Sequence, residues 1–197
     1  MSKQKAVNKH GFTLMELLVV VIIIGVLAGI ALPQYKKTIK KAHLSTWLSY
    51  VNAYMKGIDM YLLQNGMPMT KVVEFSGTEA LAGREFYNLD IDLPCSSVPN
   101  QSSSCGTSAG HFHVGCSDHC WINMGGIYIP SPILKKGESL QLTKNYPDLD
   151  NDNWVLYSVS TINTDTRKLV CELWKNHFGI ERMSEDAAAS CAEVGIN

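Results

Sequence analysis

The chain has 197 residues, 46% of them hydrophobic, and a formal net charge of −1 at pH 7. This length and composition suit one domain with a hydrophobic core and exclude a chain that is disordered throughout. Lys3, Lys5 and Lys9 lie in the first eleven residues, so the remainder keeps 14 of the 17 basic residues against all 18 acidic ones, a charge of −4. Such a mildly acidic remainder gives no overall support for nucleic-acid binding, which usually requires a basic face.

An apolar run begins near the N-terminus. Residues 17–32 contain no charged or strongly polar side chain, and with residues 12–16 the run reaches 21 residues. As an α-helix this is about 30 Å, enough to span a bilayer. A short basic segment before an apolar run is also typical of a secretory signal, with residues 29–31 as a weak cleavage site. The acidic Glu16 inside the run, and Gly11 before it, count against that interpretation.

Residues 11–25 read GFTLMELLVVVIIIG, which resembles the prepilin signature of type IV pilins and type II secretion pseudopilins. In that signature a leader ending in Gly is followed by Phe, Thr, Leu, any residue and Glu. The resemblance implies that residues 1–11 are a leader, and that an inner-membrane prepilin peptidase cuts between Gly11 and Phe12 and methylates the new Phe12 amine. The apolar helix, assigned to residues 12–33, would then stay on the protein.

Glu16 is an acidic side chain within the apolar run. An ionised carboxylate in hydrocarbon costs several kcal/mol unless it is paired, so it needs a partner or a proton. The family resemblance implies that Glu16 meets the Phe12 amine of a neighbouring subunit, which neutralises both charges and sets the axial register of a filament. The alternative is a protonated Glu16 that faces other helices without a specific partner. The Thr13 hydroxyl is a further candidate, bonding back along the helix or to the neighbouring amine.

Gly25, Gly29 and Pro33 recur every four residues, on one face of the predicted helix. Small residues allow close contact between helices, and a proline marks a point where a helix can bend or lose hydrogen bonds. We expect packing and local melting here on assembly. Residues 31–37, ALPQYKK, resemble the exit from the membrane helix in type IVa pilins more than that in the major pseudopilins.

Four lysines, Lys36, Lys37, Lys40 and Lys41, follow the apolar run. They roughly balance the positive charge of residues 1–11, so the positive-inside rule does not set the orientation of the span. The prepilin signature supplies the orientation instead.

The helix is predicted to continue as an amphipathic helix over residues 34–65. Apolar residues recur there at spacings of three and four, the pattern of one buried helix face. They are Leu44, Leu48, Val51, Met55, Ile58 and Leu62. Gly66, with Pro68 shortly after it, is a helix stop.

Residues 34–197 are predicted to form one globular head. In it the amphipathic helix is followed by a loop at residues 66–125 and by an antiparallel sheet and a C-terminal loop at residues 126–197. Residues 66–125 are irregular by pattern, with Ser, Gly and Pro increasing within residues 94–110. Short strands are predicted at residues 126–130, 140–143, 153–161 and 167–174, with a hairpin loop at residues 162–167. An antiparallel sheet of about four strands packed on the long helix gives an α+β fold, and the resemblance implies the same type IV pilin layout.

All six cysteines lie from residue 95 onward. An even number in an exported chain indicates disulfides, although the sequence alone does not pair them. We expect Cys95–Cys105, Cys116–Cys120 and Cys171–Cys191. The last pair encloses the C-terminal segment much as the disulfide-closed loop of type IV pilins does, whereas the other four cysteines depart from the simplest members of the family.

His111, His113, Cys116, His119 and Cys120 lie within ten residues of one another. They would form a tetrahedral zinc site if the thiolates stayed reduced. Because export favours oxidation, we interpret the segment as a disulfide with surface histidines.

Asp148, Asp150 and Asp152 alternate as in calcium-binding loops. However, no Gly occupies the sixth position, and Val159 stands where the bidentate Glu should be. We interpret the segment as a solvated turn, so no cofactor is expected.

The sequence contains no nucleophile elbow, phosphate loop or paired-carboxylate motif, and no enzymatic activity is expected. We expect a structural subunit of a type IV pilus, which is a homopolymer. The subunit would be held in the inner membrane before assembly and would be extracellular in the filament. The filament could serve adhesion, motility or DNA uptake. The resemblance implies prepilin peptidase, the inner-membrane assembly machinery, minor pilins and membrane lipid as partners. The alternatives are a pseudopilin of a type II secretion system and a membrane-anchored metal- or ligand-binding module.

Overall fold

The computed structural model describes residues 12–66, 71–75, 85–86, 89, 91, 95–98, 101–107, 110–125, 133–145, 154–159 and 161–197. The chain forms two compact units, Met1–Ile39 and Lys40–Asn197, and each is described by itself.

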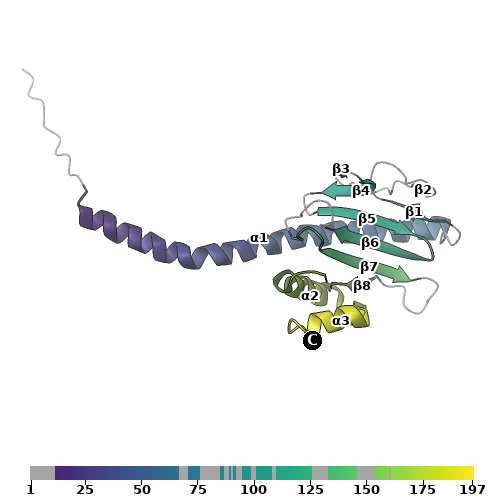
Figure 1. The fold of residues 1–197 in the computed structure, drawn as a ribbon. Helices are drawn as coiled ribbons and strands as arrows, with labels where there is room; N and C mark the ends of the chain where they lie inside the picture. Colours follow the sequence, from purple (N-terminus) through teal and green to yellow (C-terminus); the bar gives the residue numbers. More distant parts are fainter. Residues whose placement is uncertain are drawn as a thin grey trace, which may run out of the picture. The chain divides into compact units, whose positions relative to one another are not determined.

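A single long helix, α1, comprises Leu14–Asn65 (Figure 1). These bounds agree with the predicted helix over residues 12–65 to within the usual uncertainty of helix ends. The first unit contains its apolar half, with Pro33 inside the helix. The helix ends where predicted, because Gly66 adopts a φ of 71° and its amide donates to the Leu62 carbonyl at 2.9 Å.

The half of α1 in the second unit buries one face. Its buried residues recur at helical spacing and are Leu44, Trp47, Leu48, Val51, Tyr54, Met55, Gly57, Ile58 and Tyr61. Five of the six positions that the sequence analysis assigned to this face are therefore buried, and Leu62 is partly buried. This face is the helical side of the hydrophobic core.

One sheet of eight strands lies in the described part of the second unit. The strands are β1 (Val73–Glu74), β2 (Glu85–Phe86), β3 (Ser96–Val98), β4 (Gln101–Thr107), β5 (Gly110–Cys116), β6 (His119–Gly125), β7 (Ser139–Asn145) and β8 (Val155–Ser158). Paired strands are antiparallel except β1 and β2. β5 to β8 form a meander, and β4 and β1 share the other edge of β5 (Figure 1).

The α+β prediction is confirmed, but its strands are only partly right. β7 contains the predicted strand at residues 140–143, and β8 lies within the one predicted at residues 153–161. The prediction at residues 126–130 lies outside the described residues. The predicted loop at residues 66–125 is wrong, because β4, β5 and β6 form there. The sheet therefore has more strands than the four expected.

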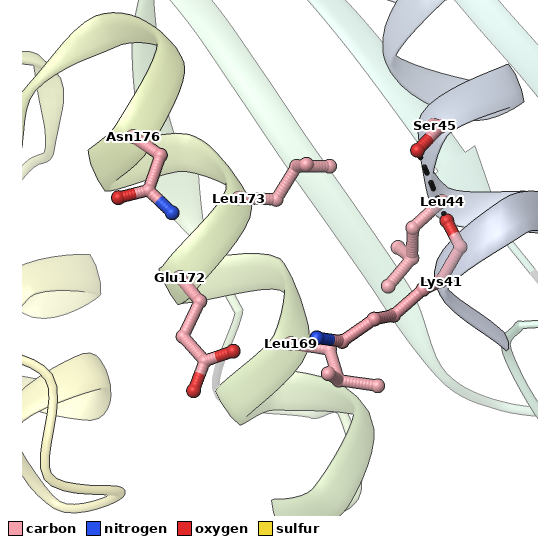
Figure 2. Close-up of a pocket in the computed structure, with 7 residues that line it drawn as sticks. All are labelled: Lys41, Leu44, Ser45, Leu169, Glu172, Leu173 and Asn176. Carbon is pink, nitrogen blue, oxygen red and sulfur yellow. Dashed lines mark hydrogen bonds between the residues drawn. The ribbon is translucent and has the colours of Figure 1, made fainter. Parts of the chain in front are cut away.

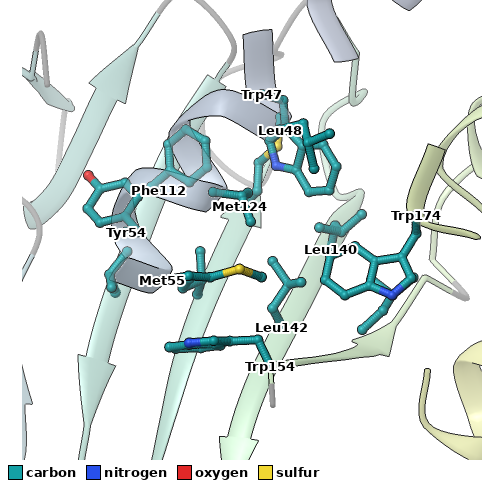
Figure 3. Packing of buried hydrophobic residues seen from close by; sticks show 14 of the residues in the cluster. Trp47, Leu48, Tyr54, Met55, Phe112, Met124, Leu140, Leu142, Trp154 and Trp174 are labelled. Carbon is teal, nitrogen blue, oxygen red and sulfur yellow. The ribbon is translucent and has the colours of Figure 1, made fainter. Parts of the chain in front are cut away.

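The core forms between one face of the sheet and α1. In β5 and β6, Phe112, Val114, Ile122 and Met124 are at most 2% exposed. Phe112 packs against the ring of Tyr54 with centroids 5.4 Å apart. Figure 3 shows Tyr54, Phe112 and Met124 among Trp47, Met55, Leu140, Leu142, Trp154 and Trp174. The alternation of inward and outward residues is the period-two signal that the loop prediction overlooked.

A second helix, α2, comprises Thr164–Phe178. The predicted strand at residues 167–174 and the hairpin loop at residues 162–167 are therefore wrong. Asn163 caps this helix by accepting a hydrogen bond from the Thr166 amide at 3.1 Å. The buried residues of α2 have helical rather than alternating spacing, and they are Thr166, Leu169, Val170, Cys171 and Trp174.

The C-terminal segment forms η1 (Ile180–Arg182) and α3 (Glu185–Ala192). Its start covers the outer edge of β8, where Leu156 forms a parallel bridge with Met183. The Ser184 amide donates to the Leu156 carbonyl at 2.9 Å, and the Ser184 hydroxyl donates to the Tyr157 carbonyl at 2.7 Å. The edge of the sheet is therefore hydrogen-bonded at these residues.

Three disulfides link Cys95 to Cys105, Cys116 to Cys120 and Cys171 to Cys191. These are the pairs chosen from the sequence. The first joins the strand pair of β3 and β4, the second closes the turn between β5 and β6, and the third fastens α3 to α2. The C-terminal segment is thus closed by a disulfide, as expected for the pilin layout.

Candidate assembly site on the N-terminal helix

The start of α1 is a capping box formed by Thr13 and Glu16. The Thr13 amide and hydroxyl donate to Oε2 of Glu16 at 2.8 and 2.9 Å. In return the Glu16 amide donates to the Thr13 hydroxyl at 3.2 Å. This reciprocal arrangement satisfies backbone donors that have no partner within the helix.

The capping box holds the carboxylate of Glu16 at the helix end that follows Phe12. Both bonds from Thr13 are accepted by one carboxylate oxygen, Oε2. A carboxylate has two acceptor oxygens with several lone pairs, so Thr13 does not exhaust its capacity. An additional donor, such as an amine, can therefore reach Glu16 while the helix stays capped.

The apolar half of α1 is uncovered in the single chain. Every large hydrophobic side chain from Leu14 to Leu32 is between 44% and 88% exposed, and Phe12 before them is 83% exposed. The most apolar 18-residue segment of α1 has a mean hydropathy of 2.8, and none of it is buried. By length and composition alone, the helix could cross a membrane. An apolar surface of this extent requires lipid or other apolar helices around it.

Gly25, Gly29 and Pro33 lie on successive turns of this exposed helix. A Cβ built on Gly25 or Gly29 meets no atom within 4 Å, so the two glycines leave a smooth strip that another helix can approach closely. Pro33 lacks the amide hydrogen that would otherwise bond to the Gly29 carbonyl one turn earlier. The turn from Gly29 to Pro33 thus lacks one backbone hydrogen bond and begins at a residue without a side chain.

The proposed cleavage point is described on one side only. Phe12 lies directly before the helix, whereas Gly11 lies outside the described residues. The Asp148, Asp150 and Asp152 segment also lies outside them, so the calcium question stays a prediction.

The histidine- and cysteine-containing segment forms the hairpin of β5 and β6. Cys116 and Cys120 are bonded to each other, which removes both thiolates from the zinc set. His113 contacts Oε1 of Glu74 through Nε2 at 3.0 Å, and His119 contacts Asp118 at 2.8 Å. Within the described ranges, no group of three or more His, Cys, Asp or Glu could hold a metal ion.

Sequence reasoning missed the contact between His113 and Glu74. Glu74 is fully buried on β1, 39 residues before His113, so no local pattern connects the two. Burial, followed by repulsion from His113, also lowers the pKa of His111. His113 is thus hydrogen-bonded within the sheet, to a residue of the neighbouring strand β1.

A small groove of about 150 Å³ lies between α1 and α2 in the second unit. Figure 2 shows Lys41, Leu44 and Ser45 of α1 facing α2 across it. The residues that line it from α2 are Leu169, Glu172, Leu173 and Asn176. It has leucines on both sides and polar groups beside them, and no sequence motif marked it.

Comparison with known proteins places the same N-terminal residues in a known motif. The family model described as the prokaryotic N-terminal methylation motif matches residues 7–32. The type IV major fimbrial protein FimA of Dichelobacter nodosus is 36% identical over 75 residues, which is 38% of this chain and 48% of that protein. The fimbrial protein EcpB of Eikenella corrodens is 38% identical over 61 residues, 31% of this chain and 38% of that protein.

A secretion protein is similar to a comparable extent. The type II secretion system core protein G of Pseudomonas aeruginosa is 38% identical over 82 residues, 41% of this chain and 55% of that protein. The chain thus spans less than two thirds of the length of each of these relatives. No solved structure matches the chain significantly.

Proposed function

We propose that this chain, which is a protein of the type IV pilin and pseudopilin family, is a structural subunit that polymerises through its N-terminal helix. The observation that carries the proposal is the pairing of an uncovered apolar helix with a carboxylate held at its start. A helix that is only a membrane anchor would use Glu16 for capping alone, which an uncharged Gln can also do. A subunit that must find register with a neighbour also uses the charge.

The first step is processing of the precursor. Prepilin peptidase removes residues 1–11 by cutting between Gly11 and Phe12 and methylates the Phe12 amine. The family-model match across this junction supports the step. Processing leaves a positively charged amine one residue before Thr13, and so close to the capping box.

Before assembly the subunit is stored in the inner membrane with the span of residues 12–33 in lipid. A fully ionised Glu16 in hydrocarbon is costly, and hydrogen bonds from Thr13 compensate for only part of the lost hydration. The stored state is therefore raised in free energy at this one side chain. Pairing with a cation relieves that cost.

In the filament, Glu16 receives the Phe12 amine of a neighbouring copy. This pairing neutralises two charges in an apolar setting and fixes the axial step between subunits. The strip at Gly25 and Gly29 lets neighbouring helices approach, and Pro33 allows the adjoining turn to lose its hydrogen bonds without large cost. After assembly the globular part of the chain is extracellular.

Two kinds of filament remain as candidates, and we favour a type IV pilus. The exit sequence at residues 31–37 and the fimbrial relatives support the pilus. The similarity to a type II secretion core protein supports a pseudopilus as the second candidate. In either setting the partners are further copies of this chain, prepilin peptidase and the inner-membrane assembly machinery.

Intact mass spectrometry of non-reduced protein from sheared surface filaments and from membranes tests the proposal. We expect a mass that lacks residues 1–11, carries one methyl group and is six hydrogens lighter because of three disulfides. Cells without prepilin peptidase are the control and should retain the leader. Protein that keeps its leader and is found only in membranes would contradict a filament subunit.

A further inference from the structure

The lysines that follow the apolar run have no role in the function proposed above. Lys36, Lys37 and Lys41 are exposed and Lys40 is partly exposed on α1. No ion pair joins any of the four lysines to another described residue. Lys41 and Glu172 line the same groove, but they do not form an ion pair either. A concentration of positive charge thus lies directly after an apolar span.

The four lysines form one basic face of the helix. Lys36 with Lys40, and Lys37 with Lys41, are one turn apart, so like charges are neighbours on the helix surface. Like-charged pairs at this spacing destabilise a helix. An anionic partner outside the chain removes that repulsion, whereas water alone only screens it.

The distance from the apolar run identifies the partner. Lys36 lies four residues beyond Leu32, about 6 Å along the helix axis, and Lys41 lies nine residues beyond it, about 14 Å. The headgroup layer on each side of a bilayer is about 5–8 Å deep. Because flexible lysine stems reach along the helix toward headgroups, all four ammonium groups come within reach of lipid phosphates.

The position of Tyr35 also indicates that this part of the helix lies at the headgroup layer of the membrane. Tyr35 is 65% exposed and lies between the end of the apolar run and the first lysine. Exposed aromatic side chains with a polar tip favour the boundary between hydrocarbon and headgroups. The order of apolar run, tyrosine and lysines therefore follows the polarity of one bilayer leaflet.

We infer that Tyr35, Lys36, Lys37, Lys40 and Lys41 form a collar that binds anionic phospholipid headgroups on the side of the membrane reached after residue 33. The inference rests on the proposed membrane-stored subunit and adds its lipid partner. The collar fixes how deeply the stored helix sits. Assembly must then exchange these headgroups for other neighbours, so anionic lipid stabilises the stored state over the filament.

The test is lipid selection in a bilayer by the processed protein, residues 12–197, which lacks Lys3, Lys5 and Lys9 of the leader. This protein is reconstituted into vesicles of phosphatidylcholine containing trace spin-labelled phosphatidylglycerol or spin-labelled phosphatidylcholine, and the motionally restricted fraction is measured for each. We expect the wild type to prefer phosphatidylglycerol by about fivefold at low salt, and the preference to fall as salt is added. The variant with Lys36→Gln, Lys37→Gln, Lys40→Gln and Lys41→Gln should lose the preference.

A matched control removes the same charge elsewhere. The exposed lysines outside the collar that serve for it are Lys56, Lys135, Lys136 and Lys168. Changing these four to Gln should leave the lipid preference intact, and a collar variant with four Lys→Arg changes should also keep it. Head melting temperatures establish that each variant is folded.

Three outcomes would overturn the inference. In the first, the collar variant with glutamines selects phosphatidylglycerol as strongly as the wild type does. In the second, the control variant loses as much selection as the collar variant. In the third, the collar variant with glutamines keeps its lipid selection but forms no filaments, which assigns the lysines to contacts between copies. Filament formation by the wild type is scored separately in cells, so failure of the proposed filament function is distinguishable from failure of the collar.

Discussion

Lys144 on β7 donates a hydrogen bond to Asp59 on α1 at 2.8 Å, with only 6% of the lysine side chain exposed. Trp154 donates its indole N–H to the same carboxylate oxygen at 3.2 Å. One carboxylate of the helix is therefore linked both to β7 and to the residue before β8.

Replacing Asp59 by Asn should destabilise the globular part of the chain by about 1–2 kcal/mol, because it removes the charged acceptor that Asp59 offers to the buried Lys144 ammonium. The exposure of Asp59, 40% of its side chain, keeps the effect below that of a fully buried pair. Urea unfolding of the detergent-solubilised chain measures it. In a double-mutant cycle, adding Lys144→Met should recover part of the loss. Strict additivity of the two changes would show that the pair is not coupled.

Glu138 should make stability depend on pH. Burial is the largest single influence and raises its pKa, but hydrogen bonds from the amides of Lys135 and Asn163 and from the Asn163 side chain together outweigh it, so the pKa lies below the ordinary value of 4.5. Because the folded state has the lower pKa, this contribution is fully present above pH 4.5 and is lost as the pH falls through the folded pKa.

A Glu138→Gln variant checks this pH dependence. It should be about 1–2 kcal/mol less stable than the wild type at pH 7, and the difference should narrow as the pH falls below about 4.5. Thermal unfolding at a series of pH values gives the comparison. If the difference in stability between the two proteins were the same at every pH, the charge of the Glu138 carboxylate would not be what stabilises this part of the chain.

Glu16→Ala should insert into membranes normally but give about tenfold fewer filaments or less, because the partner of the Phe12 amine is lost and an unpaired buried charge costs several kcal/mol. Counting sheared filaments against membrane-inserted subunit measures this.

Glu16→Gln separates charge from capping. Glutamine can complete a capping box but cannot neutralise an amine. It should therefore impair assembly as strongly as alanine does, whereas Thr13→Ala, which keeps the charge, should impair it less. Normal filaments from the glutamine variant would reduce the role of Glu16 to capping its own helix.

Replacing Cys171 and Cys191 together by Ser should lower stability by about 3 kcal/mol, since the two residues are 20 positions apart. The C-terminal segment should then become sensitive to protease while membrane insertion is unchanged. Replacing Cys116 and Cys120, which are four positions apart, should cost less, about 2 kcal/mol in the same chain-entropy treatment. Equal protease resistance of all three proteins would contradict a stabilising C-terminal closure.

The sequence predicted well where a physical requirement is local. The apolar run, the amphipathic face from Leu44 to Leu62 and the stop at Gly66 each follow from spacing within one helix, and all appear in the structure. The Thr13 hydroxyl was a candidate to bond back along the helix, but it donates forward, to the Glu16 carboxylate three residues later.

The errors arose where two patterns competed. Residues 167–174 are rich in apolar and β-branched or aromatic side chains, which favoured a strand, yet the Asn163 cap and the burial of Leu169 and Trp174 make them helical. In β4 to β6, serine and glycine residues made the alternation of apolar and polar side chains hard to detect in the sequence. Partners distant in sequence, such as Glu74 for His113, left no local signal at all.

The covered edge of β8 restricts how copies of this chain can associate. A free sheet edge is a template on which any extended segment can add a further strand. Here Met183 and Ser184 already occupy the hydrogen-bonding groups of Leu156 and Tyr157. Strand addition is therefore blocked at these residues of β8, and another copy of the chain that approaches this edge can attach there only through side chains.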